Sequence, residues 1–118
     1  TNVGYWSNLA LPVAQPRTFV TPSYFGTLGY AFPTALGAKA GNPDRQVVAL
    51  CGDGGFLYSP QELATATKYG INVVALVFNN AAYGAIVTSN PTAPLPPEYP
   101  SEQVLFTVTF YYNEEPLY

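Results

Sequence analysis

Two short apolar runs dominate the hydrophobic pattern of the chain, at residues 47–50 (VVAL) and 73–78 (VVALVF). Both are rich in β-branched residues and are bounded by turn-forming residues, which predicts strands buried on both faces. The 22 residues from 51 to 72 leave room for a helix and for a right-handed crossover between parallel neighbours. We therefore predict an α/β fold built on a doubly wound, mainly parallel sheet.

The helix of this crossover has recognisable start and stop signals. Ser59 is followed by Pro60 and, three residues after the serine, by Glu62, which is the pattern of a capping box. Gly70 then provides a natural stop. We predict a helix between these signals, with Ser59 and Glu62 as its cap.

A second helix is expected within residues 28–40, where glycine and alanine predominate. Small side chains allow close packing of a helix against a sheet, with Phe32 and Leu36 as the larger contacts. Pro33 indicates that the regular helix begins near it, and the turn-forming residues 41–44 should close it.

The N-terminal segment has no clear periodicity. Residues 1–16 are predicted to form a connecting segment, in which Trp6 serves as a packing residue. Residues 17–21 are predicted to be a short third strand that carries Phe19 and Val20 inward.

The C-terminal part differs in composition. Prolines at positions 91, 94, 96, 97 and 100 exclude a helix or a central strand and predict a stiff extended connector. Residues 103–112 are β-rich and predict one strand, which would be an association edge unless covered. We expect one partial domain at 1–86 and a separate tail of unknown role at 87–118.

Composition excludes several functions. Only 9% of the 118 residues are charged and the formal net charge is −3, so a basic nucleic-acid-binding patch is excluded. The chain has no histidine, which excludes a histidine base or a Ser-His-Asp triad within it. Cys51, the single cysteine, is expected to be a small core residue. The sparse charge also suggests a surface covered by another domain or subunit, although a poorly soluble fragment fits equally well.

The sequence has no methionine, which fits either a removed initiator or a fragment of a longer protein. No signal peptide and no apolar span of eighteen residues is present, so we expect a cytoplasmic protein without a membrane segment.

Candidate chemistry lies where the two main strands end. Asp53 follows the first strand among Gly52, Gly54 and Gly55, and Asn80 follows the second. The carboxyl edge of an open α/β sheet is where ligands bind. A carboxylate and an amide are hard oxygen ligands for Mg²⁺ or Ca²⁺, and the glycine-rich turn offers main-chain N–H groups for a phosphate.

These residues carry a family resemblance. Gly52-Asp53-Gly54 followed at this spacing by Asn79-Asn80 resembles the thiamine-diphosphate motif of enzymes related to acetolactate synthase, benzoylformate decarboxylase and pyruvate decarboxylase. The segment 26–39 (GTLGYAFPTALGAK) is similar to the stretch that precedes this motif in the same family. The resemblance covers about residues 1–86.

The resemblance implies that Asp53, the side-chain oxygen of Asn80 and the main-chain carbonyl of Ala82 bind Mg²⁺. It implies that the diphosphate lies against the amides of Gly54 and Gly55. Leu28 matches the apolar residue that enforces the bent conformation of the cofactor, and the Gly26 carbonyl would accept a hydrogen bond from the aminopyrimidine. The other cofactor-binding positions implied are Gly52 and Tyr83.

The activity implied is that of a lyase or carboligase acting on 2-oxo acids. The activating glutamate of the family lies in a pyrimidine-binding domain of the same or another chain, usually in a homo-oligomer, so residues 1–118 alone should be inactive. Two alternatives remain: a non-catalytic interaction module or degraded fragment, and another doubly wound domain in which both motifs are ordinary turns.

Overall fold

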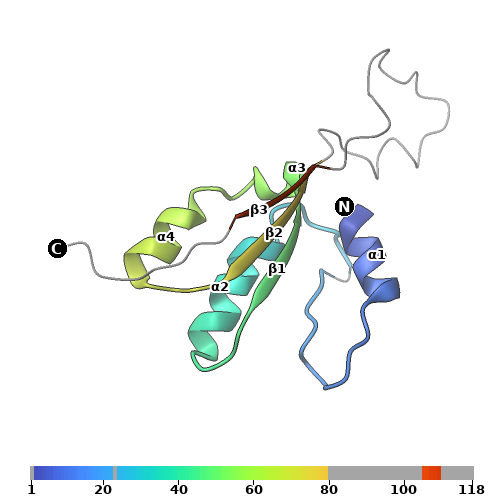
Figure 1. Ribbon diagram of the computed structural model, residues 1–118, viewed down its shortest axis with the longest axis horizontal. Coiled ribbons are helices and arrows are strands. Elements are labelled where there is room, and N and C mark those ends of the chain that lie inside the picture. The colour runs from blue at the N-terminus through green and yellow to red at the C-terminus, as the bar shows by residue number, and fades with distance from the viewer. Residues whose placement is uncertain (1, 23, 80–104, 110–118) are drawn as a thin grey trace, which may run out of the picture.

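The computed structural model describes residues 2–22, 24–79 and 105–109 (Figure 1). The elements follow the order α1 (Asn2–Ala10), α2 (Ala31–Gly41), β1 (Val48–Gly52), α3 (Asp53–Phe56), α4 (Glu62–Tyr69), β2 (Val74–Asn79) and β3 (Leu105–Thr109). The proline-rich connector predicted after residue 86 lies outside the described residues, as do Asn80, Ala82 and Tyr83.

The sheet has the order β1-β2-β3. β1 and β2 are parallel, with Val48 opposite Val74 and Gly52 opposite Phe78. β3 falls within the strand predicted at 103–112 and pairs antiparallel with β2. The parallel pair joined through α3 and α4 confirms the α/β class, whereas a doubly wound sheet stays a prediction.

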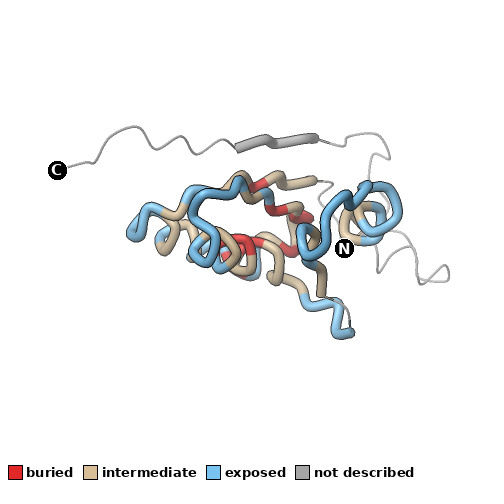
Figure 2. The backbone as a smooth tube through the Cα atoms, turned by 90° about the horizontal axis from the view of Figure 1, so that it is seen from below, coloured by how far each residue is buried: buried red, intermediate tan, exposed pale blue. Residues whose placement is uncertain are grey.

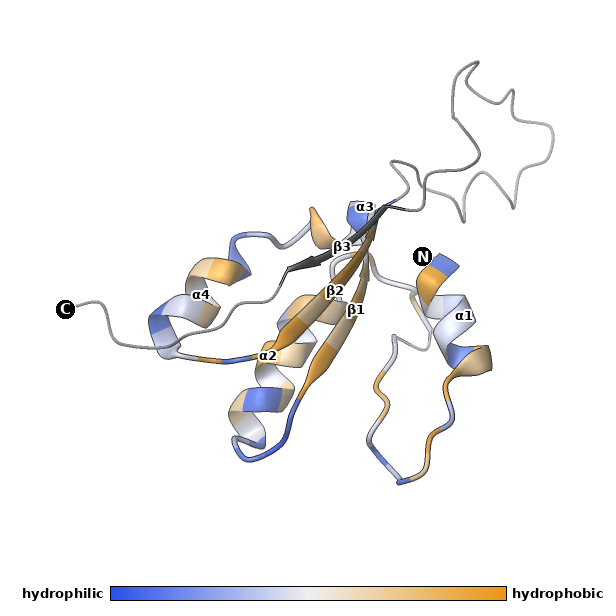
Figure 3. Ribbon diagram, viewed as in Figure 1, coloured by the Kyte–Doolittle hydropathy of each residue, from blue (hydrophilic) through white to orange (hydrophobic). Residues whose placement is uncertain are grey.

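The core lies where α2 meets the parallel strands. Its buried residues are Phe32, Ala35 and Leu36 of α2, Ala49 and Cys51 of β1, and Ala75 of β2. Most are small, so the helix packs close to the sheet, as the glycine- and alanine-rich sequence predicted. Figure 2 shows buried stretches on both the strands and the helix, and Figure 3 shows that β1 and β2 are hydrophobic along most of their length.

The helix α2 ends at Gly41, within the turn-forming residues predicted to close it, and it buries Phe32 and Leu36 as predicted. Asn42 follows the helix, and its backbone N–H donates to the Lys39 carbonyl over 3.1 Å. The Lys39 ammonium in turn donates to the carbonyls of Pro43 and Arg45, each over 2.7 Å. These bonds fix the turn that leads from α2 into β1.

The capping box predicted for α4 is wrong. The helix begins at Glu62, and its N-cap residue Gln61 makes no side-chain cap hydrogen bond. Ser59 is buried, and its hydroxyl donates to the Gly29 carbonyl over 3.2 Å, so it is not available to the helix. The predicted stop at Gly70 is confirmed: this residue has φ 60° and ψ 34°, a left-handed conformation that glycine adopts without steric cost.

Three predictions for the N-terminal segment are also wrong. Asn2–Ala10 forms α1 instead of a connector, and Trp6 is 70% exposed instead of packed. No residue of α1 is buried, so its apolar side chains do not contribute to the core. The strand expected at 17–21 does not form, because Arg17 has φ 61° in a turn, and Val20 is exposed.

Within the described ranges, none of the helices is both long and apolar enough to cross a membrane.

We expect Leu36→Ala to lower the free energy of unfolding by about 2–5 kcal/mol, because it opens a cavity under α2. Leu36 is 4% exposed, whereas Leu9 of α1 is 82% exposed. Leu9→Ala is therefore the matched control and should change stability by less than about 0.5 kcal/mol. Urea unfolding followed by circular dichroism checks both values, and equal effects would contradict the assignment of the core.

Candidate functional site at the strand ends

The site is built where the parallel strands end. β1 ends at Gly52 beside Phe78, and β2 ends one residue later at Asn79. Asp53 directly follows β1, and Asn79 directly precedes Asn80 in the sequence. The parallel pairing therefore brings the Asp53 turn and the start of the second turn to the same edge of the sheet.

The glycine-rich turn predicted after β1 is instead one turn of helix, α3. Gly52 is extended, with φ −78° and ψ 155°, and the Leu57 N–H donates to the Asp53 carbonyl over 3.1 Å. The positive-φ glycines of the described residues are Gly26, Gly29 and Gly70. The left-handed conformation that favours glycine therefore occurs in the turn before α2, at Gly26 and Gly29. The glycines after β1 have negative φ angles or lie in α3.

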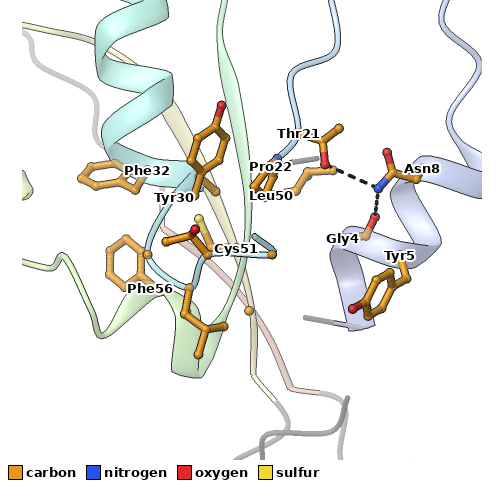
Figure 4. Close-up of a pocket in the computed structure, with 17 residues that line it drawn as sticks. Gly4, Tyr5, Asn8, Thr21, Pro22, Tyr30, Phe32, Leu50, Cys51 and Phe56 are labelled. Carbon is orange, nitrogen blue, oxygen red and sulfur yellow. Dashed lines mark hydrogen bonds between the residues drawn. The ribbon is translucent and has the colours of Figure 1, made fainter. Parts of the chain in front are cut away.

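A cavity of about 110 Å³ lies at this edge. One wall is the turn that enters α2, with Gly26 and Leu28 among its residues, and a second wall is the end of β1 with α3. The complete lining is Gly4, Tyr5, Asn8, Thr21, Pro22, Gly26, Thr27, Leu28, Gly29, Tyr30, Ala31, Phe32, Leu50, Cys51, Gly52, Gly55 and Phe56. Figure 4 shows Phe32 and Phe56 on one side of Cys51 and α1 on the other.

The third wall was missed by sequence reasoning. It comes from α1 and from the segment before the turn, through Gly4, Tyr5, Asn8, Thr21 and Pro22. The Asn8 amide donates to the Gly4 carbonyl over 2.9 Å and to the Thr21 hydroxyl over 3.5 Å (Figure 4). The spacing of four between Gly4 and Asn8 becomes a signal only once residues 2–10 are known to be helical.

The predicted site residues are therefore distributed in three ways. Gly26, Leu28, Gly52 and Gly55 line the cavity. Asp53 and Gly54 are half-buried in α3 and follow the lining residue Gly52 without themselves lining it. The three remaining positions, Asn80, Ala82 and Tyr83, lie outside the described residues, so the structure brings together one side of the predicted site.

No cluster of three His, Cys, Asp or Glu side chains that could hold a metal occurs in the described part of the chain. The predicted ligand set needs no such cluster, since it combines one carboxylate, one amide and one main-chain carbonyl. Of this set, the structure describes Asp53.

A larger cavity of about 580 Å³ lies between residues 17–22, α2 and residues 45–50. Its lining includes Arg17 and Arg45 and none of the residues predicted for the cofactor. The smaller cavity at the strand ends is therefore the candidate site.

Comparison with known proteins identifies the family of this domain. Residues 1–104 match the family described as thiamine pyrophosphate enzyme, C-terminal TPP binding domain; thiamine pyrophosphate is another name for thiamine diphosphate. The chain belongs to this family.

Three curated relatives illustrate the match. A probable 2-ketoarginine decarboxylase of Pseudomonas aeruginosa is 46% identical over 87 residues, which are 73% of this chain and 16% of that protein. The sulfoacetaldehyde acetyltransferase of Alcaligenes xylosoxydans xylosoxydans is 43% identical over 84 residues, 71% of this chain and 14% of that protein. Acetolactate synthase isozyme 1 large subunit of Escherichia coli is 38% identical over 89 residues, 73% and 16% respectively. The matched part of the chain thus spans about one sixth of each relative.

The cavity suits the thiamine diphosphate of this family in its chemistry. Glycines on both walls allow a ligand to approach the main chain, and Leu28, Leu50 and Phe56 offer apolar contacts to a ring. None of the four cationic side chains of the chain lines it. Lys39 is bonded to the turn after α2, and Lys68 lies 5.4 Å from the ring centre of Tyr69.

Cys51 is a core residue of this thiamine-diphosphate-binding domain. It belongs to the buried cluster under α2 and also lines the cavity. Burial raises the pKa of its thiol from 9.0 to about 11. A raised thiol pKa means that the neutral form is favoured, so this residue is not an activated nucleophile.

We expect Cys51 to react with Ellman's reagent at pH 8 at least about 100-fold more slowly in the native protein than in urea. The pKa difference of about two units alone lowers the thiolate fraction by this factor. The contribution of the neutral Cys51 thiol to the free energy of unfolding should be fully present below pH 9. It should be lost as the pH rises through 11. Similar rates in native and unfolded protein would contradict the burial of this thiol.

Proposed function

We propose that this domain binds thiamine diphosphate through Mg²⁺ and serves as the cofactor domain of a lyase or carboligase acting on 2-oxo acids. The observation that carries the proposal is the cavity at the carboxyl ends of β1 and β2. Two of its walls come from the segments 26–31 and 50–56, which contain all of the described residues implied by the family motifs. Ligands of open α/β sheets bind at this edge.

The charge balance supports a metal-mediated mode of binding. A diphosphate carries several negative charges, the chain has a formal net charge of −3, and no lysine or arginine lines the cavity. A divalent cation is the simplest source of compensating charge in such a site. Asp53 would hold it together with the Asn80 amide oxygen and the Ala82 carbonyl.

The diphosphate would then lie against the main-chain amides of Gly54 and Gly55, beside Gly52 and Tyr83. At the other end of the cofactor, the Gly26 carbonyl would accept a hydrogen bond from the aminopyrimidine. Leu28 would support the bent conformation from below. Gly26 and Leu28 both line the cavity, which supports this assignment.

When bound, thiamine diphosphate supplies a nucleophilic carbon and an electron sink for substrates that carry a carbonyl group. The residues of this chain bind and orient it. The relatives bear names of a decarboxylase, a synthase and an acetyltransferase. Since these names describe different outcomes, we propose the cofactor chemistry and the 2-oxo acid class without choosing among them.

We further propose that the site is completed by a pyrimidine-binding domain that carries the activating glutamate, on the same or another chain of a homo-oligomer. Exposed aromatic side chains at the cavity support a covering partner. Tyr24 and Phe25, immediately before the lining residue Gly26, are 94% and 93% exposed. Tyr5, which lines the cavity, is also largely exposed. Large aromatic groups of this kind are typical of surfaces that another protein covers.

Isothermal titration of the 118-residue chain with thiamine diphosphate in MgCl₂ should show saturable binding that EDTA removes. Asp53→Ala should weaken binding at least about 10- to 100-fold, because even outer residues of metal sites have effects of this size. Asp44→Ala, which removes an exposed carboxylate from the turn before β1, is the matched control and should bind normally. Metal-independent binding, or equal effects of the two substitutions, would refute the proposal.

The chain alone should bind the cofactor without decarboxylating pyruvate above the rate of free thiamine diphosphate, because none of its residues matches the activating glutamate. Release of CO₂ from labelled pyruvate measures this directly. Substrate turnover by the isolated 118-residue chain would show that the proposed division of roles between domains is wrong.

A further inference from the structure

Ser59 is the one buried polar side chain among the described residues, with 7% of its surface exposed. Its hydroxyl donates to the main-chain carbonyl of Gly29 over 3.2 Å, across a separation of thirty residues in sequence. The net contribution of such a hydrogen bond to stability is about 0.5–1.5 kcal/mol, so this contact helps to hold the two segments together.

The orientation of Ser59 is fixed by the elements on either side of it. Its backbone N–H donates to the Phe56 carbonyl of α3 over 3.1 Å. Its own carbonyl accepts from the backbone N–H of Glu62, the first residue of α4, over 3.2 Å. The hydroxyl therefore extends from a segment held at both ends toward the turn that contains Gly29.

Gly29 is in direct contact with the same segment. It has φ +81°, and a methyl group added there would lie 2.7 Å from the Tyr58 Cβ and 3.7 Å from the Gly55 carbonyl oxygen. Any other residue would therefore be strained by its backbone conformation and would push the two segments apart. The turn and the α3–α4 connection thus meet at one close contact with one hydrogen bond.

The two segments joined in this way are adjoining walls of the candidate site. Gly29 belongs to the lining turn with Gly26 and Leu28, and Gly55 and Phe56 line the cavity from α3. If the proposed function holds, the first wall meets the pyrimidine end of thiamine diphosphate and the second meets its diphosphate. Their separation must then match the length of one ligand.

We propose that Ser59 is a positioning residue for cofactor binding: its bond to the Gly29 carbonyl sets the spacing between the pyrimidine wall and the diphosphate wall. The inference rests on the proposed function for the identity of the ligand. The contact between Ser59 and Gly29, which we call the joint, is a property of the chain without ligand. Ser59 does not line the cavity, so it acts through Gly29. A role in capping α4 does not account for this residue, because that helix has no side-chain cap hydrogen bond.

The test compares two probes, thiamine diphosphate and inorganic diphosphate, each titrated in MgCl₂. Ser59→Ala should weaken thiamine diphosphate about 3- to 10-fold, the effect of one hydrogen bond, and should change inorganic diphosphate affinity less than about twofold. Ser59→Thr, which keeps a hydroxyl, should bind thiamine diphosphate with an affinity close to that of the wild-type chain. Thr67→Ala removes a comparable hydroxyl-to-carbonyl bond, 2.9 Å to Leu63 within α4, and should change neither affinity.

Equal weakening of both probes by Ser59→Ala, or no weakening of either, would overturn the inference. If Ser59→Ala does not fold, Ser59→Cys carries the same comparison, because a thiol keeps the volume and is only a weak donor. Failure of the wild-type chain to bind either probe would instead refute the proposed function, and the joint is then tested without ligand.

That test is amide hydrogen exchange of the cofactor-free protein. Ser59→Ala should accelerate exchange at residues 26–31 about 3- to 10-fold, and exchange in the last two turns of α2 should stay unchanged. Gly29→Ala should act in the same direction. Its matched control is Gly37→Ala within α2, where an added methyl group meets nothing within 4 Å. Unchanged exchange at residues 26–31 in both variants at the joint would show that it does not hold the turn.

Discussion

The parallel pairing of β1 with β2 is the constraint on which the rest of this domain depends. Since Gly52 lies opposite Phe78, both strands end at the same edge, and everything that follows either strand starts there. α2 packs on the buried faces of these strands, so the turn that enters it is brought to the same edge. The cavity forms because three segments distant in sequence converge at these ends.

The candidate cavity has no cationic side chain in its lining. The cations of this domain are used elsewhere: Lys39 fixes the turn into β1, Lys68 lies over an aromatic ring, and both arginines line the other cavity. If the proposed function holds, the anionic cofactor would be bound by main-chain dipoles and by a metal that Asp53 helps to hold. On that proposal, affinity for the cofactor would depend on the availability of a divalent ion.

The sequence predicted those parts of the fold whose causes are local. The apolar runs of β1 and β2, the small residues of α2 and the αL stop at Gly70 each depend on neighbours in sequence, and each appears in the structure. Ser59 shows the opposite case. Its spacing to Glu62 satisfied a local capping pattern, yet its partner is Gly29, thirty residues earlier, and only the tertiary fold brings the two together.

The candidate site divides in the same way. Gly26, Leu28, Gly52 and Gly55 were identified through family motifs and do line the cavity. Asn8 and Thr21 were not, because α1 has no buried face and the segment before the turn has no periodicity, so neither gave a signal.

The close packing of α2 on the strands has a consequence for how this domain can diverge. Ala35, Ala49 and Ala75 are each at most 5% exposed, and the helix and the sheet approach each other at these alanines. Larger side chains there would have to separate the two layers and would carry the turn at the head of α2 away from the strand ends. Evolutionary drift should therefore accumulate on the outward surfaces of α1 and α4, while these alanines limit the mutational tolerance of the interior.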